Sequence, residues 1–183
     1  MAVKQKLSVE QYLALPEEKP NLEYVCGEVL RKAMPNKEHV EVVDGAGYQL
    51  RAYRLTQTAA HTGPEPRVRF ATERGDEYRL PDYAYWAPGK PFDDGNEMLP
   101  PTLAIEVRSP DESMTDQREK CRYYRRYGVD VAWLFDPRTR TVEVFDAEHD
   151  GAAATGALRS PLLPGFELDA AALFTEAMGA VEA

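Results

Sequence analysis

The stretch TLAIEVRSPDESMTDQREKCRYYRRYGVDVAWLFDP, residues 102–137, decides the fold. Its first six residues are apolar enough for a central strand, and VDVAWLFDP predicts a further strand that ends at Pro137. Between these strands, Ser113 with Asp116 offers a helix N-cap, and Gly128 supplies the stop. A strand, a helix and a strand in this order predict a parallel pair joined by a right-handed crossover.

Shorter patterns surround this unit. PRVRFATE at 66–73, EYRLPDYAYW at 77–86 and TRTVEVFD at 139–146 each predict a strand. LEYVCGEVLRK predicts an N-terminal β-hairpin about Cys26 and Gly27, after a short helix that begins with a capping box at Ser8. Asn36 predicts the start of a long helix over about 37–58. The middle of the chain therefore reads helix, strand, strand, strand, helix, strand, which indicates a mixed α/β fold.

Composition limits the function classes. The 183 residues suggest one domain over 1–183, and no run of eighteen apolar residues predicts a membrane span. The start of the chain has no apolar signal region, so the default location is the cytoplasm. A net charge of −9 argues against a strong non-specific nucleic-acid binder, although REKCRYYRR at 118–126 is locally basic. We expect GAAATGA at 151–157 to be a loose connection.

Two acids stand in predicted strands. Asp82 follows Pro81, and Glu106 lies between apolar residues of the central strand. A buried charge is costly unless it is paired or binds a metal. If the two strands are neighbours, both carboxylates project from one end of the sheet and repel each other unless a cation lies between them. Mg²⁺ accepts one or two carboxylates plus waters, so Mg²⁺ or Mn²⁺ is the expected cofactor.

Two cations accompany these acids. Arg108 is two residues beyond Glu106, so it should share the same face and pocket and clamp a phosphate. Lys120 shares a helix stripe with Gln117, Cys121 and Tyr124, which would place its ammonium over the end of the sheet beside Glu106. The alternative for Lys120 is a side chain that extends to water.

The pattern Pro-Asp, a gap, then Glu-x-Arg is close to Pro-Asp…(Asp/Glu)-x-Lys. The blocks SVEQYLALPE, NLEYVCGEVLRKAMPNKEH, RLPDYAYW, residues 101–145 and LLPGFEL together resemble the Uma-type restriction-endonuclease-like family of the PD-(D/E)xK nuclease superfamily, in order and over almost the whole chain. The resemblance implies a four-stranded mixed sheet flanked by helices, with an added N-terminal hairpin. The chain departs from the family at the variable position of Arg108, in the glycines of the segment 37–58, and between 55 and 66.

The resemblance also implies site residues. It implies Asp82 and Glu106 as metal ligands, with Glu23 as an accessory acid that completes the metal set. It implies Lys120 as the catalytic lysine and Gln117 as a helper one turn earlier. His39 would contact a phosphate or a water, or it would simply be a histidine at a helix end.

Two functions remain open. The first is a metal-dependent endonuclease that hydrolyses DNA, in which Lys120 positions the nucleophile and Arg108 or Arg122 clamps the phosphate. The second is a catalytically silent module that uses the nuclease fold for binding or assembly. The aromatic pairs Tyr83/Tyr85 and Tyr123/Tyr124 suggest a homodimer interface for either function. A small-molecule hydrolase has little support, because GxSxG and phosphate-loop motifs are absent from the sequence.

Overall fold

Two β-sheets and four helices make up residues 6–179, the part of the chain that this computed structural model describes. The larger sheet has the strand order β10-β9-β8-β7-β6-β3, and the smaller has the order β2-β1-β5-β4. The strands of the larger sheet are β3 (His61–Pro64), β6 (Tyr83–Trp86), β7 (Leu103–Val107), β8 (Val131–Asp136), β9 (Thr141–Phe145) and β10 (Asp150–Ala153). Those of the smaller are β1 (Leu22–Val25), β2 (Glu28–Arg31), β4 (Val68–Thr72) and β5 (Gly75–Arg79). The helices are α1 (Val9–Leu13), α2 (Lys37–Arg54), α3 (Met114–Arg126) and α4 (Ala170–Met178).

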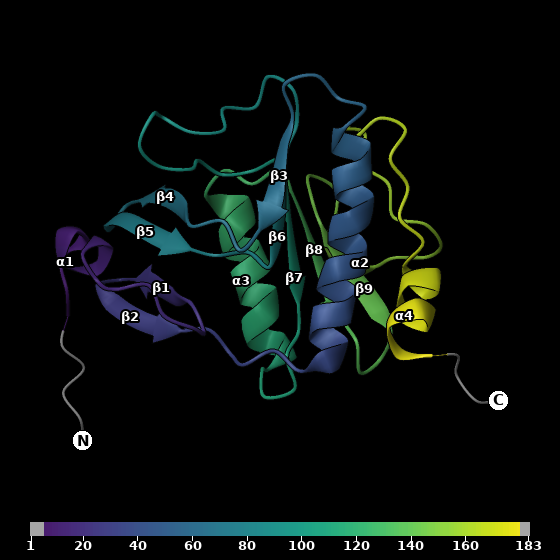
Figure 1. Ribbon diagram of the computed structural model, residues 1–183, viewed down its shortest axis with the longest axis horizontal. Coiled ribbons are helices and arrows are strands. Elements are labelled where there is room, and N and C mark those ends of the chain that lie inside the picture. The colour runs from purple at the N-terminus through teal and green to yellow at the C-terminus, as the bar shows by residue number, and fades with distance from the viewer. Residues whose placement is uncertain (1–5, 180–183) are drawn as a thin grey trace.

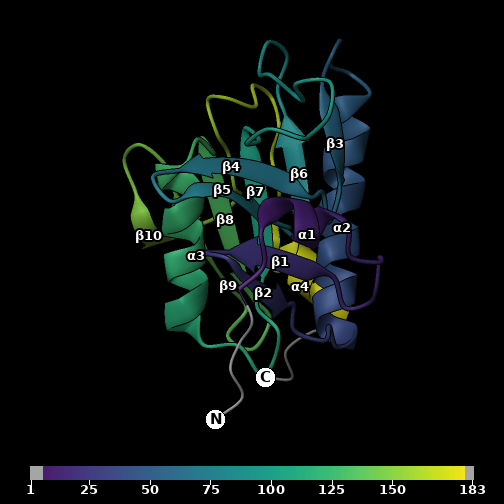
Figure 2. The ribbon, with the colours of Figure 1, turned by 90° about the vertical axis from the view of Figure 1, so that its left-hand side faces the viewer.

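Helices cover both faces of the larger sheet. Helix α3 lies on one face, while α2 and α4 lie on the other (Figures 1 and 2). The smaller sheet and α1 stand beside these layers, on the left of Figure 1. None of the helices described in residues 6–179 is long and apolar enough to cross a membrane. The predicted mixed α/β fold is confirmed.

The strand–helix–strand unit at 102–137 forms as predicted. Strands β7 and β8 pair in parallel, and α3 connects them. The Ser113 hydroxyl accepts hydrogen bonds from two backbone N–H groups of the first turn. Gly128 has a φ of +102° just beyond the helix, a conformation that favours glycine. Local cap signals therefore fix both ends of α3.

Alternation along β7 sorts its side chains between two cores. Leu103, Ile105 and Val107 face α2 and α4 and join the largest hydrophobic cluster. Ala104 faces the other way and packs with Tyr124 of α3. Since successive side chains of a strand point to opposite faces, Glu106 also lies on the α3 face. The sheet therefore presents Glu106 to α3.

Two expectations for the strands were wrong, and the larger sheet has more strands than the resemblance implied. The predicted single strand 77–86 is two strands, β5 and β6, which belong to different sheets. Pro81 lies at the break, where it has no N–H to give to a ladder. Part of the expected loose connection 151–157 belongs to β10, and β3 forms in the segment that departs from the family. These two edge strands extend the implied four-stranded sheet to six.

The glycines of α2 have a packing role. A Cβ at Gly47 would lie 2.4 Å from the ring of Tyr83, and one at Gly45 would lie 2.4 Å from a methyl group of Leu173. The helix therefore packs closely against β6 and α4 at these points. Asn36 caps α2 as predicted, and the helix ends at Arg54, before the expected residue 58.

Candidate active site

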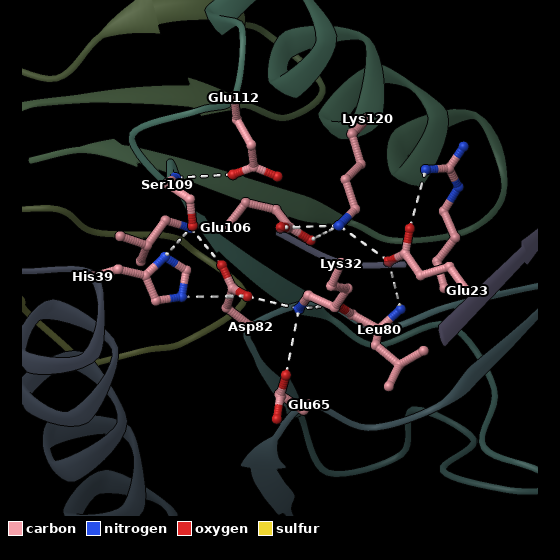
Figure 3. Close-up of polar contacts among 12 residues, drawn as sticks. Glu23, Lys32, His39, Glu65, Leu80, Asp82, Glu106, Ser109, Glu112 and Lys120 are labelled. Atoms are coloured by element: carbon pink, nitrogen blue, oxygen red, sulfur yellow. Dashed lines mark hydrogen bonds and ion pairs between the residues drawn. The ribbon is translucent and has the colours of Figure 1, made fainter. Parts of the chain in front are cut away.

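Asp82 and Glu106 lie opposite each other at one end of the larger sheet. Tyr83 pairs with Ile105 in the antiparallel β6–β7 ladder, so one further step of this register sets Asp82 against Glu106. The Asp82 Oδ2 accepts a hydrogen bond from the Val107 N–H at 2.7 Å, which fixes the carboxylate at this edge. Both side chains are buried. The structure thus brings the two predicted acids together (Figure 3).

Asp82 has an ammonium as its nearest charge. The Nζ of Lys32, just after β2, donates to Asp82 Oδ1 at 2.7 Å and to the Leu80 carbonyl at 2.8 Å. The His39 Nε2 is 3.7 Å from the same Asp82 oxygen, and its Nδ1 is 3.2 Å from the Ser109 hydroxyl. Burial alone would raise the pKa of Asp82, but the positive charges of Lys32, His39 and Lys120 together outweigh burial and lower that pKa. Asp82 is therefore a carboxylate.

Glu106 is held from α3. Lys120 Nζ lies 3.1 Å from its carboxylate, and the Tyr124 hydroxyl donates to its Oε1 at 2.7 Å. Burial raises the pKa of Glu106 to about 7, and the charge of Asp82 adds to this shift while Lys120 opposes it. Burial opposes the charge of Lys120, but Glu106 and other carboxylates raise its pKa overall. Lys120 lies beside Glu106, where the helix stripe predicted it.

Glu23 joins the cluster through cations. Its Oε1 accepts from the Leu80 N–H at 3.0 Å and lies 3.1 Å from Lys120 Nζ, and its Oε2 is 3.7 Å from Arg79. Burial would raise the pKa of Glu23, but Lys120 and then Arg79 lower it. Glu23 does not line the small cavity described below. Glu23 therefore contacts Lys120 and does not border the cavity, and its place among the metal ligands stays a prediction.

A small cavity of about 30 Å³ borders the two acids. It is lined by Lys32, Ala33, Pro35, His39, Glu65, Asp82, Glu106, Ser109 and Glu112. Carboxylate oxygens are the donors that Mg²⁺ and Mn²⁺ prefer, and Mg²⁺ needs only one or two of them. Within residues 6–179 no group of three or more histidine, cysteine or acidic side chains is gathered for a metal. The donor set thus fits an ion held by Asp82 and Glu106 plus waters or a phosphate.

Five polar residues that line the cavity or contact Glu106 were not singled out from the sequence as site residues. Lys32, Glu65, Ser109 and Glu112 line the cavity, and Tyr124 was expected only to share the stripe of Lys120. Lys32 and Glu65 are far in sequence from Asp82 and Glu106, so periodicity could not place them. The one available signal was the position of Lys32 inside the block NLEYVCGEVLRKAMPNKEH.

Arg108 and Arg122, the two arginines predicted to clamp a phosphate, do not line the cavity beside Asp82 and Glu106. The Arg108 guanidinium bonds both oxygens of Asp136, at 3.2 and 3.1 Å, and the Glu112 carbonyl at 2.8 Å. It lines a separate hollow, so the predicted pocket shared with Glu106 is wrong. Strand β7 ends at Val107, and the side chain of Arg108 turns to the last residue of β8. Arg122 is also occupied, by Glu119 and Asp150 at 2.8 Å each, outside the cluster.

The predictions for Gln117 and for the aromatic pairs have different outcomes. Gln117 is buried on α3, and its Oε1 finds no hydrogen-bond partner in the described part of the chain, so its helper role stays a prediction. Tyr83, Tyr85 and Tyr124 are buried in the cores, with at most 3% of each exposed. They cannot form the homodimer interface that the aromatic pairs suggested.

Comparisons with known proteins show the family and the fold of this chain. A family model described as "Uma2: Putative restriction endonuclease" matches residues 9–171. A crystal structure described as "a putative nuclease belonging to DUF820", from Anabaena variabilis ATCC 29413, is similar with a TM-score of 0.80. It shares 24% sequence identity, and the match covers 94% of this chain and 99% of the other, which shows the fold. The comparison with curated proteins gave no match.

Proposed function

The chain belongs to the Uma2 family of restriction-endonuclease-like proteins, and from this premise we propose that it is a metal-dependent endonuclease that hydrolyses DNA. Asp82 and Glu106, opposed at the end of two paired strands, carry the proposal. Such proteins usually depend on a metal. A bound Mg²⁺ or Mn²⁺ would activate a water and stabilise negative charge on a phosphate.

The acids, Lys120 and Tyr124 would each have a separate role in the reaction. Asp82 and Glu106 would hold the ion, and the Val107 N–H keeps the Asp82 carboxylate in place. Lys120, fixed between Glu106 and Glu23, would orient the attacking water or the phosphate with its ammonium. Tyr124 orients Glu106 through its hydroxyl. Each group is held by a second partner, which is what a preorganised site requires.

Two hollows that adjoin the small cavity are lined by arginines as well as acids, and these arginines support a polyanionic substrate. A hollow of about 1150 Å³ shares Glu65 with the small cavity and is lined in part by Arg51, Arg54 and Arg67. A second, of about 550 Å³, shares Ser109 with it and includes arginines at 108, 138 and 140. Phosphate contacts in DNA complexes come largely from such side chains. A DNA strand running from one hollow to the other would cross the acids.

The test is cleavage of plasmid and linear DNA with Mg²⁺, with Mn²⁺ and with chelator. The wild type should cut only with metal, and Asp82→Ala and Glu106→Ala should lose the cutting. Glu143→Gln is the matched control, because Glu143 is also a buried acid paired with a cation, but it lies on β9 and its partner is Arg118. Unchanged cutting by Asp82→Ala would overturn the proposal.

A silent binding module remains the second candidate. One observation favours it, because Lys32 and Lys120 already neutralise the acids without a metal. DNA binding that survives Asp82→Ala, without cleavage by the wild type, would support this candidate. A homodimer is proposed only from the need for two cuts in a duplex, and a light-scattering mass equal to one chain would exclude it.

A further inference from the structure

Lys32 neutralises the site in a way that the motif does not require. Its side chain is 12% exposed, and its Nζ is closer to Asp82 than any other cation is. The cluster holds three buried acids, Asp82, Glu106 and Glu23. Their contacts supply three cations, Lys32, Lys120 and Arg79. The formal charge is therefore zero without a metal.

A divalent ion would upset this balance. Mg²⁺ binds a carboxylate oxygen at about 2.0–2.1 Å, and the Lys32 ammonium is 2.7 Å from the oxygen Oδ1 of Asp82. An ion and an ammonium on one carboxylate repel each other strongly in a buried site. Binding of the ion therefore requires that Lys32 leave Asp82.

A second acceptor for Lys32 is close. Glu65 Oε1 lies 3.7 Å from Lys32 Nζ, at the rim of the same cavity, and its other oxygen is held by Lys19 at 2.8 Å. Figure 3 shows the Lys32 ammonium between the two carboxylates. We propose that Lys32 is the counter-ion of the metal-free site and moves from Asp82 to Glu65 when a divalent ion binds. This inference rests on the proposed function.

Calorimetric titration with Mn²⁺ alone tests whether Lys32 is the counter-ion that a divalent ion must displace. Lys32→Met should bind Mn²⁺ at least about tenfold more tightly than the wild type, because no ammonium has to be displaced. Lys32→Arg keeps the charge and should not gain affinity. Arg31→Met is the matched control, since Arg31 is next to Lys32 in the chain but bonds Glu18, and it should leave the affinity unchanged. Lys32→Gln replaces Lys32→Met if circular dichroism shows the latter unfolded.

A double-mutant cycle tests whether Lys32 moves to Glu65 when the ion binds. Glu65→Gln should weaken Mn²⁺ binding about tenfold in the wild type, and should have no effect in the Lys32→Met background. Equal weakening in both backgrounds would mean that Glu65 meets the ion itself, which overturns the transfer.

The affinities also separate this inference from the proposed function. Equal affinities of the wild type and Lys32→Met would overturn the Lys32 proposal alone. Absence of binding in both would overturn it together with the metal-dependent function. Binding only in Lys32→Met would support the counter-ion proposal.

Discussion

Replacing Asp82 with asparagine should destabilise the metal-free protein. The carboxylate accepts from Lys32 on one oxygen and from the Val107 N–H on the other. An asparagine has one carbonyl oxygen, so its amide N–H₂ must face one of these donors. The mutation therefore leaves a buried donor opposed by another donor, and Lys32 loses its closest negative charge.

The structure sets the size of this loss. Removing one partner of a buried ion pair costs about 3–5 kcal/mol. Lys32 keeps the Leu80 carbonyl, and the repulsion between Asp82 and Glu106 disappears, so we expect a net loss of about 2 kcal/mol. For a chain of this length, that loss lowers the melting temperature by about 4–8 °C.

Urea unfolding in chelator measures this difference. The double mutant Asp82→Asn with Lys32→Met should regain at least about 1 kcal/mol relative to the single mutant, because the orphaned ammonium is gone. Lys19→Met serves as the control and should stay within about 0.5 kcal/mol of the wild type. An Asp82→Asn variant as stable as the wild type, or more stable, would refute the reasoning. It would show that repulsion among the acids exceeds the stabilisation by Lys32.

Three further predictions concern residues of helices α2 and α3. Tyr124→Phe removes the hydrogen bond to Glu106 and should lower the free energy of unfolding by about 2 kcal/mol in urea titrations, and an unchanged value would contradict that bond. Gly47→Ala should lower the melting temperature in thermal scans, because the ring it meets is buried, while Gly45→Ala meets only the end of a leucine and should change it less. Cys121 should resist thiol reagents until urea unfolds the chain, since burial and then the charge of Glu106 raise its pKa well above the usual value; labelling in the native state would refute this.

Local signals in the sequence were sufficient for much of the fold. The caps Asn36 and Ser113 begin α2 and α3 because their side chains satisfy free N–H groups within the same turn. The hairpin about Cys26 and Gly27 forms because both residues have positive φ, at 54° and 82°. These features depend on near neighbours only, which is why pattern reasoning finds them.

The errors arose where tertiary contacts decide. The alternation that relates residue 108 to Glu106 holds only inside a strand, and β7 ends at Val107. Arg108 instead forms an ion pair with buried Asp136, and the sequence near Arg108 does not indicate that partner. Lys32 was missed for the same reason, since its partner Asp82 is 50 positions away. A sequence pattern can therefore predict the acids of such a site, but their counter-ions depend on contacts between residues that are distant in the sequence.

The cost of the buried charges favours catalysis over a silent module. Three acids are buried and paired with cations, and well-packed apolar residues of similar volume are often as stable or more stable in such positions. A module that only binds or assembles gains nothing from Glu106 beneath α3, facing Lys120 and Tyr124. In the proposed nuclease, Glu106 and Asp82 would hold the ion, which would activate a water and stabilise charge on the phosphate. We infer that the cluster is kept for a bound ion and its substrate, so metal affinity is the property that separates the two functions.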